Sequence, residues 1–287
     1  MEELNPDLVL VHGDISTTFA GALAAFYNKI PVGHVEAGLR SYDKYSPYPE
    51  EMNRILTGHI AEIQFVPTEN NKSNLIKEGI SNNIYITGNT VMDAIKHTVN
   101  SSYIFKDEIL RDIDFSNGRY ILLTAHRGEN LGKPLENICN AVKRIVEEFN
   151  DIYFIYPVHL NPAVRDTVSL ILGDTGRVKL INPLDVQDMH NLMDRCFMIM
   201  TDSGGLQEEA PSLGKPVLVL RKETERPEAI KAGTVKLVGV DEEKIYSSAK
   251  ELLTNKAEYD KMAKAVNPYG DGFASRRIVK AILHHLD

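Results

Sequence analysis

The sequence predicts an α/β protein with two doubly wound, Rossmann-like domains, the first of which lacks its beginning. Short apolar runs alternate with helical stretches, which indicates parallel sheets with helices on both faces. The alternation stops over residues 101–119, where charges are mixed and no β pattern is clear, and then it starts again. A length of 287 residues also suits two domains.

The first half opens with a buried strand expected at Leu8–Val11. The helix expected at Ser16–Asn28 carries small residues that allow close packing on a sheet, with Ser16 or Thr17 as its N-cap. The other strands expected in this half are Pro31–Val35, Ile63–Val66 and Asn83–Ile86, and the other helices are Glu50–Gly58, Asn70–Glu78 and Val91–Val99.

The second half has the pattern of a complete doubly wound domain. Its expected strands are Tyr120–Thr124, Ile152–Tyr156, Val178–Ile181, Phe197–Thr201, Pro216–Leu220 and Thr234–Val238. Its expected helices are Leu135–Phe149, Asn161–Leu172, Asp185–Asp194 and Gly205–Leu213, then charged helices within Asp241–Ala265 and a terminal helix at Ser275–Leu286.

The start of the first half does not have this complete pattern. A doubly wound nucleotide-binding domain usually begins with a strand, a Gly-rich turn and a helix, and no such turn precedes Leu8. A parallel sheet without its first strands exposes apolar edges that normally stay covered. We therefore expect a missing segment or a separate chain that supplies it.

Composition and charge narrow the class of protein. A charged fraction of 25% and a hydrophobic fraction of 43% are ordinary for a globular protein, and a net charge of −8 argues against nucleic-acid and anionic-membrane partners. Cys139 and Cys196 lie in apolar contexts and are expected to be buried free thiols. No apolar run approaches the ~20 residues that span a bilayer, and the acidic start lacks the features of a signal peptide, so we expect a cytoplasmic protein.

Three acids in short polar motifs near the start are candidate proton-transfer groups: Asp14 in VHGD, Glu36 in HVEAGLRSYD and Glu50 in YPEEMNR. We interpret each as following an apolar run, as if a strand delivered it to a cleft. Alternatively, Asp14 caps the next helix, and Glu50 with Glu51 complements a helix dipole. Jointly, with His34, Arg40 and Arg54 nearby, they favour a site.

A second motif, Thr201–Leu220, predicts a phosphate site. A strand ends at Thr201, and a Ser-Gly-Gly turn opens a helix whose exposed backbone N–H groups suit phosphate. Glu209 could accept hydrogen bonds from ribose hydroxyls, and Arg226 is placed to bind a diphosphate through two hydrogen bonds. Alternatively, these are an ordinary capped turn and a solvated charge run.

Two further strand ends carry polar groups. TAHRGEN places His126 and Arg127 where doubly wound folds bind ligands, and PVHLNP places His159 at the next strand end. The alternative is a capped loop with exposed polar residues and a structural histidine. No metal-binding motif is present and no GxGxxG follows a strand, so neither a metal nor NAD is predicted, and no cofactor is expected.

These motifs together resemble those of the non-hydrolysing UDP-N-acetylglucosamine 2-epimerases. The matching elements appear in family order over nearly the whole chain, and they include HGD, HVEAGLRS, GNTVMDA, DSGGLQEEAPSLGKPVLVLR, TERPEA and NPYGDG. The resemblance implies a glycosyltransferase-B-like fold. Its expected parts are a partial N-terminal domain at 1–108 with the acid-base carboxylates, a UDP-binding domain at 109–268, and a terminal helix at 269–287 that returns to the first domain.

The resemblance also implies an isomerase that interconverts UDP-GlcNAc and UDP-ManNAc for polysaccharide synthesis. UDP is eliminated to give 2-acetamidoglucal and then adds back, with proton transfer at C2 on both faces of the sugar. By motif matching, the acid-base positions fall on Asp14, Glu36 and Glu50, and His126 stabilises departing UDP. The implied UDP-binding residues are Ser203, Gly204, Gly205, Glu209 and Arg226. Arg127, Glu129 and His159 match residues that contact a second, activating UDP-GlcNAc in bacterial members.

Members of this family are typically cytoplasmic homodimers, so a homodimer is also implied. Two alternatives to an epimerase stay open. The chain could be a UDP-sugar-binding fragment that is inactive or depends on a partner chain for the missing strands. A glycosyltransferase of the same fold is the other alternative, and it explains the three acids less well.

Overall fold

The computed structural model describes residues 3–286. Residues 1–2 of the expected N-terminal domain and residue 287 of the expected terminal segment lie outside the described part. The chain divides into two compact units. Unit 1 combines the residues up to Ala94 with the segment from Pro268 onward, and unit 2 is Ile95–Asn267. Each is α/β with a parallel sheet, which confirms the predicted fold class.

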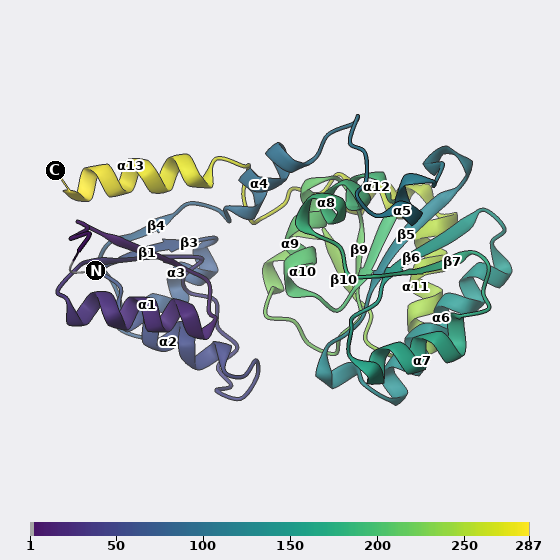
Figure 1. Cartoon of the computed structure of the whole chain (residues 1–287), viewed down its shortest axis with the longest axis horizontal. Coiled ribbons are helices and arrows are strands. Elements are labelled where there is room, and N and C mark those ends of the chain that lie inside the picture. Colours follow the sequence, from purple (N-terminus) through teal and green to yellow (C-terminus); the bar gives the residue numbers. More distant parts are fainter. Residues whose placement is uncertain (1–2, 287) are drawn as a thin grey trace. The chain divides into compact units, whose positions relative to one another are not determined.

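The sheet of unit 1 has four parallel strands in the order β1-β2-β3-β4 (Figure 1). Their bounds are Val9–His12, Val32–Val35, Ile63–Val66 and Ile84–Ile86. The helices of this unit are α1 (Ser16–Tyr27), α2 (Glu50–Ile60), α3 (Glu69–Lys77), the first part of α4 (Val91–Thr98), and α13 (Ala274–Leu286). The strands run in register, with Val9 opposite Val32 and Gly33 opposite Ile63.

Helices cover both faces of this sheet. Ala22 and Ala25 of α1 pack against Val11 and Val32 on one face. On the other face, α13 packs on the sheet through a cluster of Ile63, Phe65, Ile278 and Ala281 (Figure 1). Asp93 of α4 caps α13, since its carboxylate accepts hydrogen bonds from the backbone N–H groups of Ala274 and Ser275 at 2.9 Å.

The sheet of unit 2 has six parallel strands in the order β10-β9-β8-β5-β6-β7. Their bounds, from β5 to β10, are Arg119–Thr124, Ile152–Pro157, Val178–Ile181, Met198–Thr201, Val217–Val219 and Val235–Leu237. The chain winds outward from β5 through β6 and β7, then returns to the opposite side of β5 and continues through β8, β9 and β10. The winding therefore reverses between β5 and β8, and ligands bind at such a reversal in open α/β sheets.

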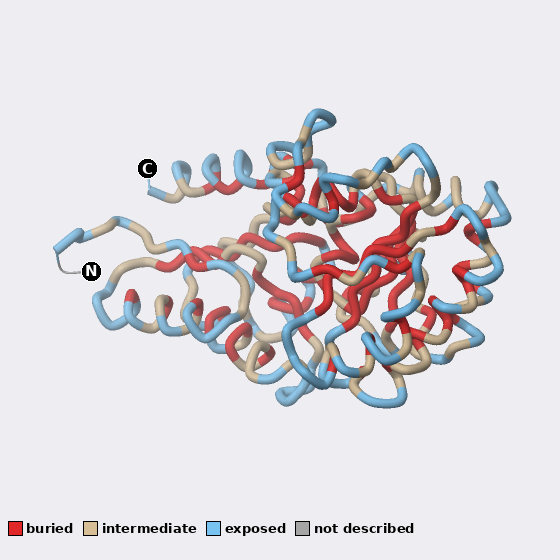
Figure 2. Tube along the Cα trace, turned by 45° about the vertical axis from the view of Figure 1, so that its right-hand side comes forward, coloured by how far each residue is buried: buried red, intermediate tan, exposed pale blue. Residues whose placement is uncertain are grey.

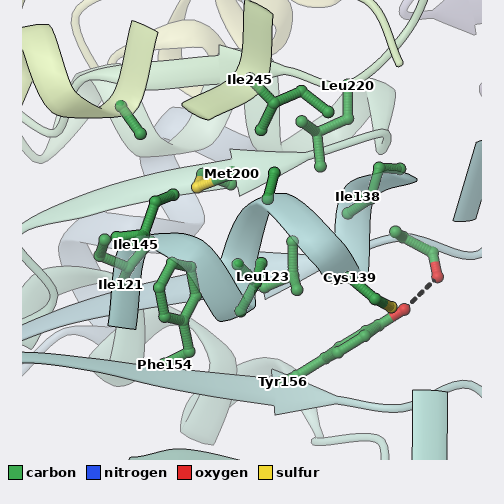
Figure 3. Close-up of a cluster of buried hydrophobic side chains, with 14 of the residues drawn as sticks. Ile121, Leu123, Ile138, Cys139, Ile145, Phe154, Tyr156, Met200, Leu220 and Ile245 are labelled. Atoms are coloured by element: carbon green, nitrogen blue, oxygen red, sulfur yellow. Dashed lines mark hydrogen bonds between the residues drawn. The ribbon is translucent and has the colours of Figure 1, made fainter. Parts of the chain in front are cut away.

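Helices also cover both faces of the second sheet. Their bounds, from α6 to α12, are Lys133–Glu148, Pro162–Leu172, Val186–Arg195, Gly204–Ser212, Pro227–Ala232, Glu242–Thr254 and Lys256–Ala263. The apolar sides of α6, α7 and α11 form one large core with the strands, and the buried stretches in Figure 2 (red) follow these strands. Figure 3 shows Ile138, Cys139 and Ile145 of α6 against the sheet, where the buried hydroxyl of Tyr156 donates to the Ala125 carbonyl.

The boundary between the units falls after Ala94, whereas the sequence led us to expect residue 108. The intervening segment belongs to unit 2 because α8 holds it. Asp188 of α8 accepts hydrogen bonds from the backbone N–H groups of Lys106 and Asp107, at 3.0 and 2.9 Å, and from the Tyr103 hydroxyl at 2.8 Å. Two short helices follow, α5 (Glu108–Arg111) and η1 (Phe115–Asn117), which the sequence did not reveal.

Two smaller findings concern the cysteines and the helices. Cys139 and Cys196 are buried free thiols, as predicted, and burial raises the pKa of each to about 12. None of the helices in the described part of the chain is both long and apolar enough to cross a membrane.

Candidate active site

Two of the predicted acids lie at the carboxyl ends of neighbouring strands in unit 1. Asp14 follows β1 by two residues, and Glu36 directly follows β2. Glu36 has a backbone φ of 65°, a left-handed conformation that is uncommon for residues other than glycine and concentrates at functional sites. Its carboxylate lies 3.4 Å from His12 Nε2 and accepts a hydrogen bond from the Asn89 amide at 3.3 Å.

Asp14 is held by α2. Its Oδ2 atom lies 2.8 Å from Arg54 Nε and 2.7 Å from Arg54 Nη2, and its backbone carbonyl accepts a hydrogen bond from the Asn53 amide at 2.8 Å. The carboxylate is thus engaged by arginine and does not cap α1. The expected cap at Ser16 or Thr17 is also wrong, because Ile15 is the N-cap and no side chain caps this helix.

Glu50 and Glu51 have different roles although they are neighbours. Glu50 is the first residue of α2 and does not follow a strand, which corrects that part of the interpretation. Its Oε2 atom is buried and accepts no hydrogen bond from any residue in the described range 3–286. Glu51 is fully buried and accepts hydrogen bonds from the Ser41 and Tyr42 backbone N–H groups and from Arg54 Nη1 at 3.1 Å.

The three acids therefore belong to one corner of unit 1. Arg54 joins Asp14 to the first turn of α2, where Glu50 lies. A Cβ atom built on Gly13 would lie 3.4 Å from Glu36 Oε2, so the Glu36 carboxylate lies beside the turn that carries Asp14.

His34 lies beneath this corner. It is fully buried, and its Nε2 atom is 2.8 Å from the Gly13 carbonyl oxygen. Its pKa is lowered to about 4, mainly by burial, and the positive charge of Arg40 contributes in the same direction. The ring is therefore neutral at physiological pH and acts as a structural support for the turn after β1.

In unit 2, the predicted site residues gather where the winding reverses. Thr124 and Thr201 end β5 and β8, and their hydroxyls are 2.5 Å apart. His126 follows β5, and its ring stacks on that of His159, which follows β6, with centroids 5.3 Å apart and planes at 9°.

The turn after β8 carries the residues that were predicted to bind phosphate. Ser203 is the N-cap of α9, and its side chain makes no capping hydrogen bond. A Cβ atom on Gly204 would lie 2.4 Å from Arg226 Nη1, so glycine allows the guanidinium to lie against the start of the helix. The predicted phosphate-binding groups therefore occupy one place.

Arg226 is buried within a chain of ion pairs. Its Nε contacts Glu208 at 2.6 Å and its Nη1 contacts Glu225 at 2.6 Å. Arg221 contacts Glu225 at 2.9 Å and Glu129 at 2.7 Å, so the chain reaches the loop after β5. Burial acts to raise the pKa of Glu225, but Arg226 and Arg221 outweigh it and hold this pKa at about 2.

Glu209, the expected ribose ligand, has a support that the sequence did not reveal. His190 of α8 is buried, with Nε2 3.3 Å from Glu209 Oε2 and Nδ1 2.6 Å from the Thr98 hydroxyl. A lone histidine in an amphipathic helix carries no signal of this contact. Asp202 was also missed, although its place directly after a strand and before the Ser-Gly-Gly turn resembles that of the other site residues.

Residues 3–286 hold no group of three or more His, Cys, Asp or Glu side chains that could bind a metal ion. The available chemistry is that of carboxylates in unit 1 and of cationic and backbone N–H donors in unit 2. Carboxylates can transfer protons, and the donors can hold an anion such as a diphosphate.

Comparisons with known proteins agree with this chemistry. The family model described as UDP-N-acetylglucosamine 2-epimerase matches residues 1–283. A putative UDP-N-acetylglucosamine 2-epimerase of Thermotoga maritima is 66% identical over 98% of this chain and 75% of its own length. The UDP-N-acetylglucosamine 2-epimerase of Bacillus subtilis is 57% identical over 99% of this chain and 74% of its own length.

Solved structures are also similar to this chain. The S. aureus MnaA–UDP complex has a TM-score of 0.94 and 54% identity, covering 99% of this chain and 77% of that one. The Neisseria meningitidis UDP-GlcNAc 2-epimerase bound to UDP-GlcNAc has a TM-score of 0.92 and 48% identity, covering 99% and 78%. This chain therefore belongs to the UDP-N-acetylglucosamine 2-epimerase family of isomerases.

Proposed function

We propose that this chain interconverts UDP-GlcNAc and UDP-ManNAc, in the cytoplasm, to supply surface polysaccharide synthesis. The observation that carries the proposal is the likeness to the N. meningitidis epimerase, whose structure holds UDP-GlcNAc. The carboxylate corner of unit 1 and the diphosphate-type site of unit 2 supply the two kinds of group that the reaction needs. The two buried free thiols suit a reducing compartment.

The proposed reaction begins with elimination. A carboxylate takes the C2 proton, the C2–H electrons form the C1–C2 double bond, and the C1–O bond breaks so that UDP leaves with its electron pair. The products are 2-acetamidoglucal and UDP. UDP then adds back at C1 while a carboxylic acid returns a proton to the other face of C2, so atoms and charges balance. Asp14, Glu36 and Glu50 are the proton-transfer groups in this proposal.

The residues of unit 2 bind the nucleotide in this proposal. Ser203, Gly204 and Gly205 offer backbone donors to phosphate, Arg226 offers its guanidinium, and Glu209 accepts from the ribose hydroxyls. His126 stabilises UDP as it leaves. Arg127, Glu129 and His159 bind a second, activating UDP-GlcNAc. The stacking of His159 on His126 supports a connection between these two sets of residues.

The test is to incubate the pure chain with UDP-GlcNAc in D₂O and to follow C2 by proton NMR. Deuterium should enter at C2 as UDP-ManNAc appears. UDP binding without exchange would contradict the proposal and favour a UDP-sugar-binding chain. Free ManNAc with UDP would indicate a hydrolysing enzyme, and transfer of the sugar to an acceptor would indicate a glycosyltransferase.

Three variants test the residues: Asp14→Asn, Glu36→Gln and Glu50→Gln. Each should slow exchange at C2 by about 100-fold or more, because it removes a proton-transfer group, while UDP affinity is unchanged. Glu258→Gln is the matched control, since this glutamate lies in α12 of unit 2 and its side chain is 43% exposed. An exchange rate like that of the wild type in any of the three would remove that residue from the mechanism.

The proposed active form is a homodimer, and a complex with a separate chain is an alternative form. Light scattering coupled to size-exclusion chromatography measures the mass of the active species. A mass of two copies of this chain supports the homodimer, and activity that appears only with a second polypeptide supports the alternative.

A further inference from the structure

Asp202 lies where the winding of unit 2 reverses, directly after β8, and it is fully buried. Its Oδ2 atom accepts three hydrogen bonds from the loop after β5. The donors are the backbone N–H groups of His126 and Arg127, both at 2.8 Å, and the Asn130 side-chain amide at 3.0 Å. One carboxylate oxygen therefore fixes the backbone that carries His126.

The second oxygen of this carboxylate has a different environment. Asp202 Oδ1 is buried and accepts no hydrogen bond from any residue in the described range. It lies 3.7 Å from His126 Nδ1, which is too long for a hydrogen bond. The His126 side chain is 40% exposed, so it has room to turn, and a buried acceptor without a donor favours closure of this gap.

The other groups around the His126 ring disfavour its positive charge. Partial burial lowers the pKa of His126, and the nearby His159 and Arg127 lower it further. Asp202 acts in the opposite direction and favours the protonated ring. Among these neighbours, Asp202 is thus the group that supports an imidazolium at this position.

We propose that Asp202 is the positioning residue of His126: Oδ2 fixes the loop, and Oδ1 accepts from Nδ1–H so that Nε2 is presented to the nucleotide diphosphate. The proposal rests on the proposed function, in which His126 stabilises UDP. The hydrogen bond made by one ring nitrogen determines the state of the other. With Nδ1–H held by Asp202, a proton taken up at Nε2 makes that atom a donor to the leaving phosphate oxygen, and the carboxylate balances the charge of the ring.

One test needs only the wild-type chain. Long-range proton–nitrogen NMR distinguishes the two neutral tautomers of a histidine ring, and the His126 signals are identified by their loss in His126→Gln. The neutral ring should carry its proton on Nδ1. A neutral ring protonated on Nε2 would overturn the proposal, whether or not any variant folds.

Two variants separate charge from loop anchoring. Asp202→Asn retains an oxygen for the three N–H donors but removes the charge. Asn130→Ala removes one donor and retains the charge. Asp202→Asn should lower the pKa of His126 by about one unit, because an opposite charge shifts a neighbour's pKa by about that much or more, whereas Asn130→Ala should leave it unchanged. Equal shifts in both variants, or no shift in Asp202→Asn, would overturn the proposal.

Binding of UDP supplies a readout tied to function. Wild-type affinity for UDP should rise as the pH falls through the titration of His126, and Asp202→Asn should reduce the affinity about tenfold at the pH where the wild-type ring is mostly protonated. Unchanged affinity in that variant would overturn the proposal. None of these measurements needs turnover, so a chain that lacks epimerase activity but shows the Nδ1–H tautomer would contradict the proposed function alone.

Discussion

Replacing Gly204 by alanine is expected to weaken UDP binding about 10- to 150-fold while the chain stays folded. Gly204 is the first residue of α9 and its φ is not positive, so alanine suits its backbone. The new methyl would lie 2.4 Å from Arg226 Nη1 and 2.8 Å from Cζ. Ordinary contact needs about 3.5 Å, so the guanidinium must retreat by about 1 Å.

The size of the effect follows from the way Arg226 is held. Glu208 and Glu225 each contact it at 2.6 Å, and the residue is buried, so the guanidinium cannot swing aside and return to the same place. A displacement of about 1 Å would break the hydrogen bonds to a diphosphate that the proposed function assigns to Arg226, and each bond to a charged group contributes about 1.5–3 kcal/mol. The loss of one such bond corresponds to the expected fall in affinity.

Isothermal titration with UDP measures the affinity, and thermal unfolding measures the stability. Gly176→Ala is the matched control, because a Cβ atom there meets nothing within 4 Å and its φ is not positive. That variant should bind UDP like the wild type. If Gly204→Ala also binds UDP like the wild type, the reasoning about Arg226 is refuted. If it binds weakly because it is unfolded, the melting curve reveals this.

Three further predictions concern buried ionisable groups. Glu51→Gln should lower the free energy of unfolding, measured by urea denaturation, by about 3 kcal/mol, because it breaks a buried ion pair. The control Glu258→Gln should change this free energy little. Equal free energies of unfolding for the two variants would contradict the prediction. Because the pKa of Glu225 is depressed to about 2, its contribution to stability is present above the ordinary glutamate pKa and is lost as the pH falls toward 2. The melting temperatures of the wild type and of Glu225→Gln should therefore converge as the pH falls. A difference in melting temperature that does not change with pH would contradict this contribution of Glu225. The His34 ring should show no NMR titration near pH 6.5, since its pKa is about 4. Its contribution to stability should be lost as the pH falls from 6.5 toward 4. An NMR titration midpoint near pH 6.5 would contradict its burial.

The sequence was most informative about strands. Ile63–Val66 and Val178–Ile181 were predicted to the residue, because short apolar runs bounded by turns have few alternatives in an α/β chain. Prediction failed where tertiary contacts decide the conformation. Residues 101–119 have mixed charge and no clear β pattern and were expected to be a linker, yet Asp188 ties Tyr103, Lys106 and Asp107 to unit 2. The short helix α10 was missed in a charged segment for the same reason.

The contacts around the candidate residues could not be predicted. The motif YPEEMNR led us to choose Glu50, but it could not show that the adjacent Glu51 is fully buried, because that depends on Arg54 and on the backbone at 41–42. Asp202 was missed because its partner His126 is 76 positions away. Likewise, His190 acquires its role from Thr98, which is 92 positions away. Such pairings arise only when strands and helices from distant segments meet.

Helix α13 has a consequence for biosynthesis. It covers Ile63 and Phe65 on the sheet of unit 1, yet all of unit 2 is translated between these strand residues and the helix. At about 5–20 residues per second, that face of the sheet waits on the order of 10 s on the ribosome without its own cover. Unit 2 has its complete chain first. Unit 1 therefore completes its fold after unit 2, and until then the Ile63 and Phe65 face of a nascent chain is open to aggregation and to chaperones.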